Sequence, residues 1–243
     1  MGRKLFSRSR LGNIVCIVGD MPNYRIERFG TEQQAVVIID DFFSEPDKLV
    51  SEAQAQSFSK QRPFYPGISA PANPVYLAEN MNLLKKAIIE AFGFSRGMSL
   101  VDCNYSLVTT RPEHLLPIQS LPHYDGVDPG RLAVLHYLCG KDKGGTGFFR
   151  HNATGFETVT KTRFQAYKST LETEIREEGL PPKSYINETT RQFEKIGEVT
   201  ASFNRCIIYR SIMLHSGLIP DDFLYEKNPK NGRLSVNTFL QAK

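Results

Sequence analysis

Two side chains that could share a metal ion stand two positions apart near the middle of the sequence. His123 and Asp125 lie in the segment Leu-Pro-His-Tyr-Asp-Gly, and in an extended backbone both would point to the same side. A third potential ligand, His215, follows far downstream in Met-Leu-His-Ser-Gly. Together they would offer two imidazoles and one carboxylate to one face of an ion and leave its opposite face open. We therefore predict a metal site formed by His123, Asp125 and His215.

This set of ligands indicates the metal chemistry to expect. Two histidines and one carboxylate on one face of the ion are typical of non-heme Fe(II) oxygenases. A 2-oxo acid co-substrate would occupy two of the open coordination positions and dioxygen the last. The distal carboxylate of a dicarboxylic co-substrate must then be neutralised at the far end of the pocket. Arg233 is the candidate, because a guanidinium binds a carboxylate with two parallel hydrogen bonds.

Two further side chains could bind the co-substrate beside Arg233. Ser235 lies two residues later on the same predicted strand, so it shares the face of Arg233 and could add a hydroxyl donor. Tyr105, on an earlier predicted strand, could add a phenol from the opposite wall. The predicted co-substrate-binding residues are thus Arg233, Ser235 and Tyr105, and no catalytic residue is predicted beyond the metal ligands.

Short β-branched runs bounded by turn residues predict the strands that would carry these side chains. They occur at residues 13–18, 35–39, 100–109, 131–138, 155–160, 205–209 and 233–240. Many short strands with Gly-rich turns favour a sandwich or barrel. A parallel sheet is disfavoured because no regular helix separates one strand from the next.

Three helices are expected beside these strands. The first begins at the start signal of Ser44 and runs to about residue 58, and the second extends from Asn80 to the stop signal Gly93. The segment between them, 61–77, is rich in Pro and aromatic residues and predicts an irregular loop. A third helix, over about 162–179, has alternating charges, which are typical of a solvated surface helix. Because it falls between the two parts of the predicted metal site, it could instead be a lid.

The remaining histidines are weaker candidates for ligands. His136 alternates with apolar residues on a predicted strand, so it is expected to be packed or to support the site from behind. His114 and His151 lie in predicted loops, where a solvated side chain is the ordinary expectation.

Composition limits the class of protein. The chain has 243 residues, 40% of them hydrophobic and 23% charged, as in an ordinary globular protein. A net charge of +4 without clustered Lys and Arg does not suggest a nucleic-acid partner. The four cysteines are widely spaced, as expected of buried free thiols in a reducing compartment. The apolar run 14–18 is too short for a membrane span, and position 6 is Phe where the myristoylation pattern has Ser or Thr. We expect a cytoplasmic protein with no membrane partner.

The ordered set of candidate residues resembles a known family. His123-x-Asp125, then His215, then Arg233 about one strand beyond, is similar to the Fe(II)- and 2-oxoglutarate-dependent dioxygenases, with the closer match in their prolyl-hydroxylase-like branch. The resemblance covers roughly residues 100–240. Three more features fit it: Tyr105 upstream of the His-x-Asp pair, the segment 135–138 followed by the Gly-Gly-Thr-Gly-Phe of 144–148, and the strand 205–209 ahead of the distal histidine.

The resemblance implies a fold and a reaction. The implied fold is a double-stranded β-helix, or jelly roll, mainly β with flanking helices and α+β overall. We expect residues 1–243 to form one domain, in which 1–99 support a core at 100–243 that contains a helical insert near 160–195. The implied cofactors are Fe(II) and 2-oxoglutarate, with dioxygen as a further co-substrate. The implied reaction releases succinate and CO2 and hydroxylates a C–H bond of an amino acid, a peptide or a small molecule.

Two other functions stay open at this point. A jelly roll can bind a metal or a small acid without catalysis, because a fold alone does not determine a function. A zinc hydrolase could use the same three ligands. That alternative gives no reason for Arg233 and Ser235, and it lacks an evident general base beside the metal.

Overall fold

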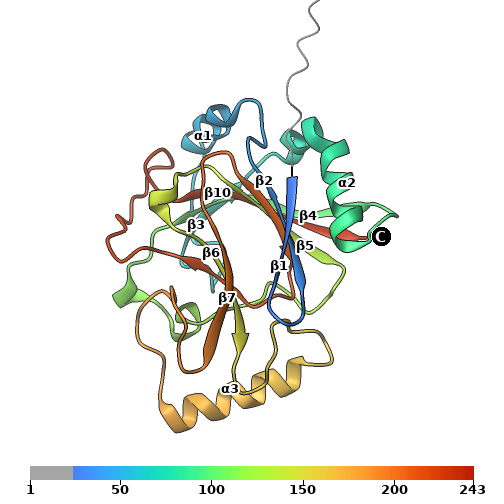
Figure 1. The fold of residues 1–243 in the computed structure, drawn as a ribbon. Helices are drawn as coiled ribbons and strands as arrows, with labels where there is room; N and C mark the ends of the chain where they lie inside the picture. Colours follow the sequence, from blue (N-terminus) through green and yellow to red (C-terminus); the bar gives the residue numbers. More distant parts are fainter. Residues whose placement is uncertain (1–23) are drawn as a thin grey trace, which may run out of the picture.

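Two antiparallel sheets make up most of the computed structural model, which describes residues 24–243 (Figure 1). The larger sheet has the strand order β1-β2-β8-β5-β10-β4-β3, and the smaller has the order β7-β6-β9. The larger sheet contains β1 (Tyr24–Phe29), β2 (Gln34–Ile39), β3 (Gly67–Pro71), β4 (Met98–Val108), β5 (Arg131–Tyr137), β8 (Cys206–Arg210) and β10 (Leu234–Ala242). The smaller contains β6 (Gly145–His151), β7 (Phe193–Thr200) and β9 (His215–Leu218).

The two sheets pack face to face. Ile38, Ile207 and Tyr209 from the larger sheet form one buried cluster with Phe148 and Val199 from the smaller. Two antiparallel sheets enclosing a core between them are the arrangement of a jelly roll. The mainly-β fold with flanking helices that the sequence predicts is therefore confirmed.

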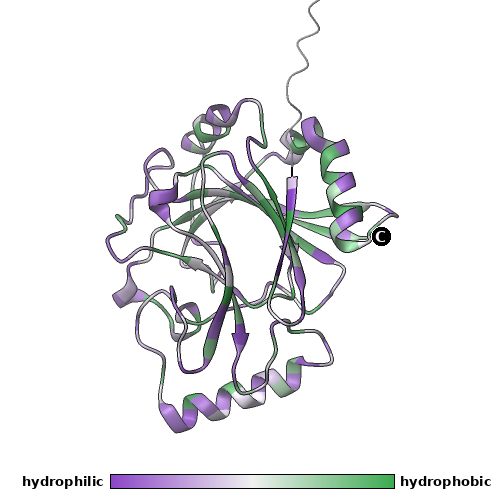
Figure 2. Cartoon of the chain, viewed as in Figure 1, coloured by the Kyte–Doolittle hydropathy of each residue, from purple (hydrophilic) through white to green (hydrophobic). Residues whose placement is uncertain are grey.

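Helices α1 (Pro46–Gln54) and α2 (Met81–Phe92) cover the outer face of the larger sheet. Leu49 of α1 and Ile88 of α2 belong to the same buried cluster as Val37, Leu132 and Ile208 of the strands beneath. These strands are buried on both faces and are accordingly rich in hydrophobic residues (Figure 2). As a result, alternate residues of one strand face either the helices or the second sheet.

Helix α3 (Phe164–Glu178) is more hydrophilic and lies across one end of the sheets (Figures 1 and 2). Short 3₁₀ turns complete the described elements: Pro74–Asn80, Pro112–His114, Pro117–Ser120 and Lys141–Lys143. Within residues 24–243, no helix is both long enough and apolar enough to cross a membrane.

Most predicted elements are present, with shifted ends. The strands predicted at 35–39, 100–109, 131–138, 205–209 and 233–240 and all three helices are observed. The first helix ends at Gln54, and its N-cap is Glu45, because both the amide and the hydroxyl of Ser44 donate to Glu79. The strand predicted at 13–18 lies outside the described residues.

The strand predicted at 155–160 is wrong, and five strands were not predicted. Residues 155–160 form only isolated bridges, between Phe156 and His151 and between Thr158 and Met213. Strands β1, β3, β6, β7 and β9 were not expected, because they are short or carry glycines and charges.

The tight turn before β6 explains the paired glycines of the sequence. Gly144 has φ +88°, and a Cβ there would stand 1.8 Å from the carbonyl oxygen of Leu218. At Gly145 a Cβ would stand 2.4 Å from the carbonyl oxygen of Val199. Only glycine fits at both positions, so β6 can lie close to its two neighbours.

A buried carboxylate joins the β1–β2 turn to the segment after β6. The Glu157 side chain is 1% exposed, and it accepts hydrogen bonds from the amides of Thr31 and Glu32 and from the guanidinium of Arg150. Burial raises the pKa of Glu157, but the hydrogen bonds from Glu32, Thr31 and Arg150 outweigh it and hold the pKa below its usual value.

We expect Glu157→Ala to lower the free energy of unfolding by about 3 kcal/mol, since it leaves the amides of Thr31 and Glu32 without an acceptor and removes the buried partner of Arg150. Because the folded-state pKa is depressed, this stabilisation is complete above about pH 4.5 and is lost as the pH falls through the folded-state pKa. Denaturant unfolding over a range of pH measures both effects. Glu194→Ala is the control, because Glu194 binds the same Arg150 at an exposed position and should cost at most about 1 kcal/mol. Equal losses for the two variants would contradict this account.

Candidate metal centre

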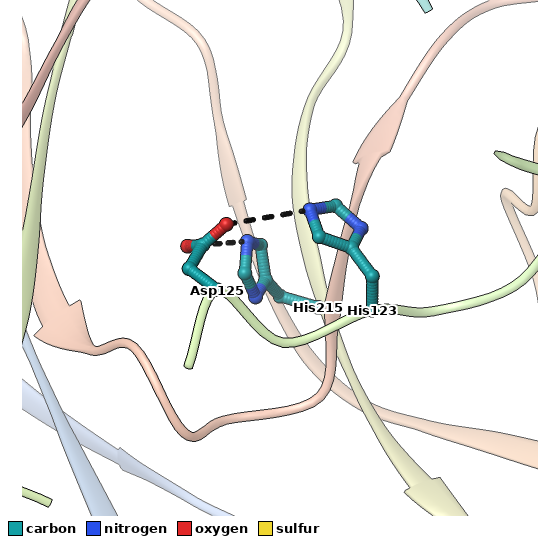
Figure 3. Close-up of side chains that lie close together, drawn as sticks. All are labelled: His123, Asp125 and His215. Atoms are coloured by element: carbon teal, nitrogen blue, oxygen red, sulfur yellow. Dashed lines mark ion pairs between the residues drawn. The ribbon is translucent and has the colours of Figure 1, made fainter. Parts of the chain in front are cut away.

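His123, Asp125 and His215 converge at one point, although His215 is far from the other two in sequence (Figure 3). His123 and His215 form a two-way backbone bridge, in which each amide donates to the other's carbonyl oxygen at 2.8 Å. The amide of Asp125 donates to the carbonyl oxygen of Ser211 at 2.8 Å. The loop with the His-x-Asp pair is thus fixed to the chain that leads into β9, and the three side chains face one another.

The distances between their ligand atoms suit one ion. His123 Nε2 lies 3.8 Å from Asp125 Oδ1, and His215 Nε2 lies 3.5 Å from Asp125 Oδ2. One atom from each of the three residues fits within a span of 4.8 Å. Metal–ligand bonds to imidazole and carboxylate are about 2.0–2.2 Å, so a single ion between these atoms could reach all three after small side-chain adjustments.

Both imidazoles direct a ring nitrogen toward Asp125. His215 Nδ1 lies 2.9 Å from the carbonyl oxygen of Met213, to which it can only donate, so its Nε2 keeps a free lone pair toward Asp125. Burial in the site and the adjacent His215 ring together lower the pKa of His123 to about 4. The His123 side chain nevertheless keeps half of its surface exposed, because it faces the cavity described below. A neutral imidazole is the form that ligates a metal.

Arg233 lies in the same cavity and is 5% exposed. Its Nε donates to the carbonyl oxygen of Lys143 at 3.0 Å, and its Nη2 donates to that of Gly145 at 2.6 Å. Among residues 24–243, no carboxylate lies within 4.0 Å of this guanidinium. A buried cation without a counter-ion is unfavourable, so the site is suited to an anionic ligand.

Strand β9 shows how far Arg233 lies from the three ligands. A Cβ built on Gly217 would stand 3.7 Å from Arg233 Nη2, so the guanidinium lies against Gly217. Gly217 and His215 are two residues apart on β9, which is about 7 Å along a strand. A five-carbon dicarboxylate could bridge this distance.

Ser235 lines the cavity on the same face of β10 as Arg233, as its spacing predicts. Its hydroxyl donates to Asn237 Oδ1 at 3.0 Å, and Asn237 Nδ2 donates to the hydroxyl of Ser106 at 3.2 Å. Asn237 and Ser106 were not predicted. They extend the polar strip from β10 to β4, the neighbouring strand.

Tyr105 is not brought to the site, and its predicted contact with a co-substrate has to be corrected. Its hydroxyl donates to Glu52 of α1 at 3.2 Å, and its ring is buried under the helices. The reason is the alternation of β4: Tyr105 shares the helix-facing side with Leu107, while Ser106 and Val108 face inward.

Tyr65 is the tyrosine that lies near Arg233. It lines the cavity, and burial raises its pKa to about 12, although the nearby charge of Arg233 and a hydrogen bond with Ser106 act in the opposite direction. The sequence placed Tyr65 in an irregular aromatic loop, because β3, which follows it and pairs with β4, was not recognised.

These positions predict different effects for two Tyr→Phe variants. For the 2-oxoglutarate binding that the sequence resemblance implies, Tyr65→Phe should weaken the affinity several-fold, because it removes one neutral hydrogen-bonding group worth about 1 kcal/mol from the cavity. Tyr105→Phe should leave that binding unchanged and should lower the free energy of unfolding only slightly, by the loss of one hydrogen bond to Glu52. Titration of 2-oxoglutarate into the anaerobic Fe(II) protein measures the dissociation constants. The reverse order of effects would contradict the placement of Tyr65 in the cavity and of Tyr105 under the helices.

The other histidines occupy three different environments. His136 is fully buried between Phe42 and Tyr76 on the helix-facing side of β5, as a packed residue should be. His114 is exposed, as predicted. The solvated position expected for His151 is wrong. Its ring is fully buried at the end of β6, where Nε2 lies 2.7 Å from Glu174 of α3.

The three metal-ligand candidates, Arg233, Ser235 and Tyr65 all line one cavity of about 810 Å³. It extends from Arg233 past the three metal-ligand candidates to α3. Phe164, Tyr167, Leu171 and Ile175, spaced along one face of α3, line its outer part. Helix α3 therefore presents these apolar side chains to the cavity together with Lys168 and Glu172, while Arg176, Glu177 and Glu178 are exposed to solvent. The sequence left open whether this helix is a solvated surface helix or a lid.

The sequence was compared with known families, and one family model matches residues 20–240. Its description is "Family of unknown function (DUF6445)". The chain belongs to this family. No curated protein matches the sequence. The match to the family covers nearly the whole chain. Because the family has no known function, the function of this protein has to be inferred from the site.

Three solved structures resemble the chain at low identity. HygX from Streptomyces hygroscopicus with nickel and 2-oxoglutarate bound is 10% identical, with a TM-score of 0.49, covering 87% of this chain and 84% of that one. A Burkholderia pseudomallei oxidoreductase of the 2OG-Fe(II) oxygenase family is 12% identical, with a TM-score of 0.43, covering 86% and 84%. An N-substituted L-amino acid dioxygenase from Burkholderia ambifaria AMMD is 13% identical, with a TM-score of 0.43, covering 92% and 97%. At such low identity, the chemistry of this chain has to come from its own side chains.

Proposed function

We propose that this protein is an Fe(II)- and 2-oxoglutarate-dependent oxygenase that hydroxylates a C–H bond of a substrate bound in the cavity beside the metal. His123, Asp125 and His215 hold the iron. Arg233 binds the distal carboxylate of 2-oxoglutarate, and Ser235 with Tyr65 supports that end of the cavity.

The observation that carries this proposal is the buried guanidinium of Arg233, which has no carboxylate partner among residues 24–243 and lies in the cavity that also holds the three metal-ligand candidates. A metal site alone would fit a hydrolase or a passive binding protein equally well. The Arg233 guanidinium lies against Gly217, two residues along β9 from His215, and its hydrogen bonds to two carbonyl oxygens leave its charge without a counter-ion among residues 24–243. A ligand that carries an anionic group to this point would supply one. An acid that chelates iron at one end and has a carboxylate at the other meets both requirements.

Each protein group has a defined task in this reaction. The bound iron supplies the oxidising chemistry that couples decarboxylation of 2-oxoglutarate to oxidation of the substrate. Asp125, His123 and His215 would hold the ion, and all three line the cavity in which the co-substrate would bind. Arg233 fixes the orientation of the co-substrate, because its guanidinium is itself held by the carbonyl oxygens of Lys143 and Gly145.

Turnover of 2-oxoglutarate tests the proposal. The protein with Fe(II), 2-oxoglutarate and dioxygen should form succinate slowly even without its substrate, and the rate should fall to background when a chelator removes the metal. Replacement of Fe(II) by Zn²⁺ should abolish succinate formation while the cavity stays occupied. Tight binding of 2-oxoglutarate without any succinate would instead indicate a binding protein, and the proposal would fail.

A further inference from the structure

The outer half of the cavity has a different character from the half that holds Arg233. It is lined by α3, by the segment before the metal loop with Ile118 and Leu121, and by the 63–66 loop with Phe64. Leu171 and Ile175 of α3 are only partly buried, and Phe64 and Ile118 are 63% and 49% exposed. Apolar side chains that stay accessible in several segments of a cavity lining are suited to an apolar ligand group.

The charged groups of this outer half are already paired with one another. Lys168 and Glu172, one turn apart on α3, lie 3.7 Å from each other. Arg62 forms an ion pair with Asp102 of β4. Apart from the metal-ligand group, Arg233 is the only charged side chain lining the cavity that has no oppositely charged partner among residues 24–243.

On the basis of the proposed function, the charges of the inner half also sum to zero once Fe(II) and 2-oxoglutarate are bound. Fe(II) and Arg233 carry three positive charges, and Asp125 and the two carboxylates of 2-oxoglutarate carry three negative charges. The loaded cavity therefore offers no unbalanced charge to a substrate. A charged group placed there would lose its hydration without gaining a partner, which is unfavourable.

We propose, on the basis of the proposed function, that the substrate presents an uncharged alkyl or aryl group to the iron and that this group binds between α3 and the 117–124 segment. The apolar face of α3 forms the outer wall of the substrate site. The cavity volume of about 810 Å³ lies within the range of sites for drug-sized ligands and leaves room for such a group beside 2-oxoglutarate. Tyr124 and Tyr167, whose rings meet edge to face at 5.9 Å, close the wall nearest the metal loop.

Competition between ligands of matched shape tests the charge preference. The probe is the neutral dye N-phenyl-1-naphthylamine, whose fluorescence rises in apolar sites, added to the anaerobic protein loaded with Fe(II) and 2-oxoglutarate. The chain has no Trp to interfere with this signal. We expect 1-octanol to displace the dye at least about tenfold more effectively than octanoate, since a charge in an apolar site costs well over 1.4 kcal/mol. Equal displacement by the two would overturn the proposal.

Three glutamate substitutions locate the binding site. Ile118→Glu and Leu171→Glu place a charge in two different elements of the cavity lining, the 117–124 segment and α3, and should each weaken dye binding at least tenfold. Ile118 is exposed, so its substitution should not disturb folding. Thr173→Glu is the matched control on the solvent side of α3 and should bind the dye as the wild type does. Unchanged binding by both wall variants would overturn the proposal.

The iron chelate of 2-oxoglutarate, measured on the same samples, separates this inference from the proposed function. All three variants should keep the absorption of that chelate, because none of them touches the metal ligands or Arg233. Loss of dye binding with a retained chelate supports the apolar substrate site. Dye binding and octanol preference without any chelate would refute the proposed function and still support an apolar cavity.

Discussion

Replacing Asp125 with alanine should reduce Fe(II)-dependent succinate formation to background. Asp125 is the only carboxylate of the three candidate ligands, and both histidines lie within 4 Å of it. Loss of a group that only supports a ligand costs about 10- to 100-fold in metal affinity, so loss of a ligand itself should cost more than about 10²-fold. Metal titration and succinate assays on the same preparation measure the two effects.

The control for this variant is Asp222→Ala, an exposed aspartate outside the cavity. It should match the wild type in metal affinity and in turnover. Thermal unfolding of the metal-free proteins should show little difference, because the Asp125 side chain makes no hydrogen bond to another described side chain. An Asp125→Ala variant with wild-type turnover would show that the metal, if any, is held elsewhere.

Replacing Arg233 with methionine should raise the KM for 2-oxoglutarate by about 10²- to 10⁴-fold. Hydrogen bonds to charged groups contribute about 1.5–3 kcal/mol each, and two of them would be lost. The same variant tests the geometry through 2-oxobutanoate, which keeps the 2-oxo acid and lacks the distal carboxylate. The wild type should strongly prefer 2-oxoglutarate, and Arg233→Met should lose that preference.

The ratio of kcat/KM for 2-oxoglutarate to kcat/KM for 2-oxobutanoate also distinguishes loss of the carboxylate partner from a general loss of stability. Arg233 donates to the carbonyl oxygens of Lys143 and Gly145, so its loss also weakens the β6 turn and lowers stability. Local damage would weaken both co-substrates equally, whereas loss of the carboxylate partner affects only 2-oxoglutarate. Arg25→Met, at an exposed pair on β1, should leave the ratio unchanged. An unchanged ratio in Arg233→Met would show that the guanidinium does not bind the co-substrate.

The sequence was most informative where one local rule determines the geometry. The period of two in an extended chain correctly predicted that Ser235 of β10 and Arg233, the residue just before that strand, face the same cavity. Turn residues and β-branched runs were enough to predict the long central strands and the mainly-β fold. Glycines mark the turn at 144–145, where a side chain has no room.

The alternation along a strand could not show which of the two sets of alternate residues faces the cavity. On β4 both faces of the strand are buried, one under α1 and α2 and the other between the sheets. Burial alone therefore does not predict which of Tyr105 and Ser106 faces the cavity. Tyr65 was missed because its position depends on the pairing of the short strand β3 with β4, a contact between distant segments. The role of α3 was open for a similar reason, since only the folded chain shows which cavity its apolar face meets.

The absorption spectrum of the anaerobic protein with Fe(II) and 2-oxoglutarate tests the central claim most directly. Chelation of iron by the 2-oxo acid gives a weak metal-to-ligand charge-transfer band, which requires the metal, the co-substrate and an open face of the ion at once. The account predicts this band in the wild type and its loss in His123→Ala. A featureless spectrum in both proteins, or the same band in both, would contradict it.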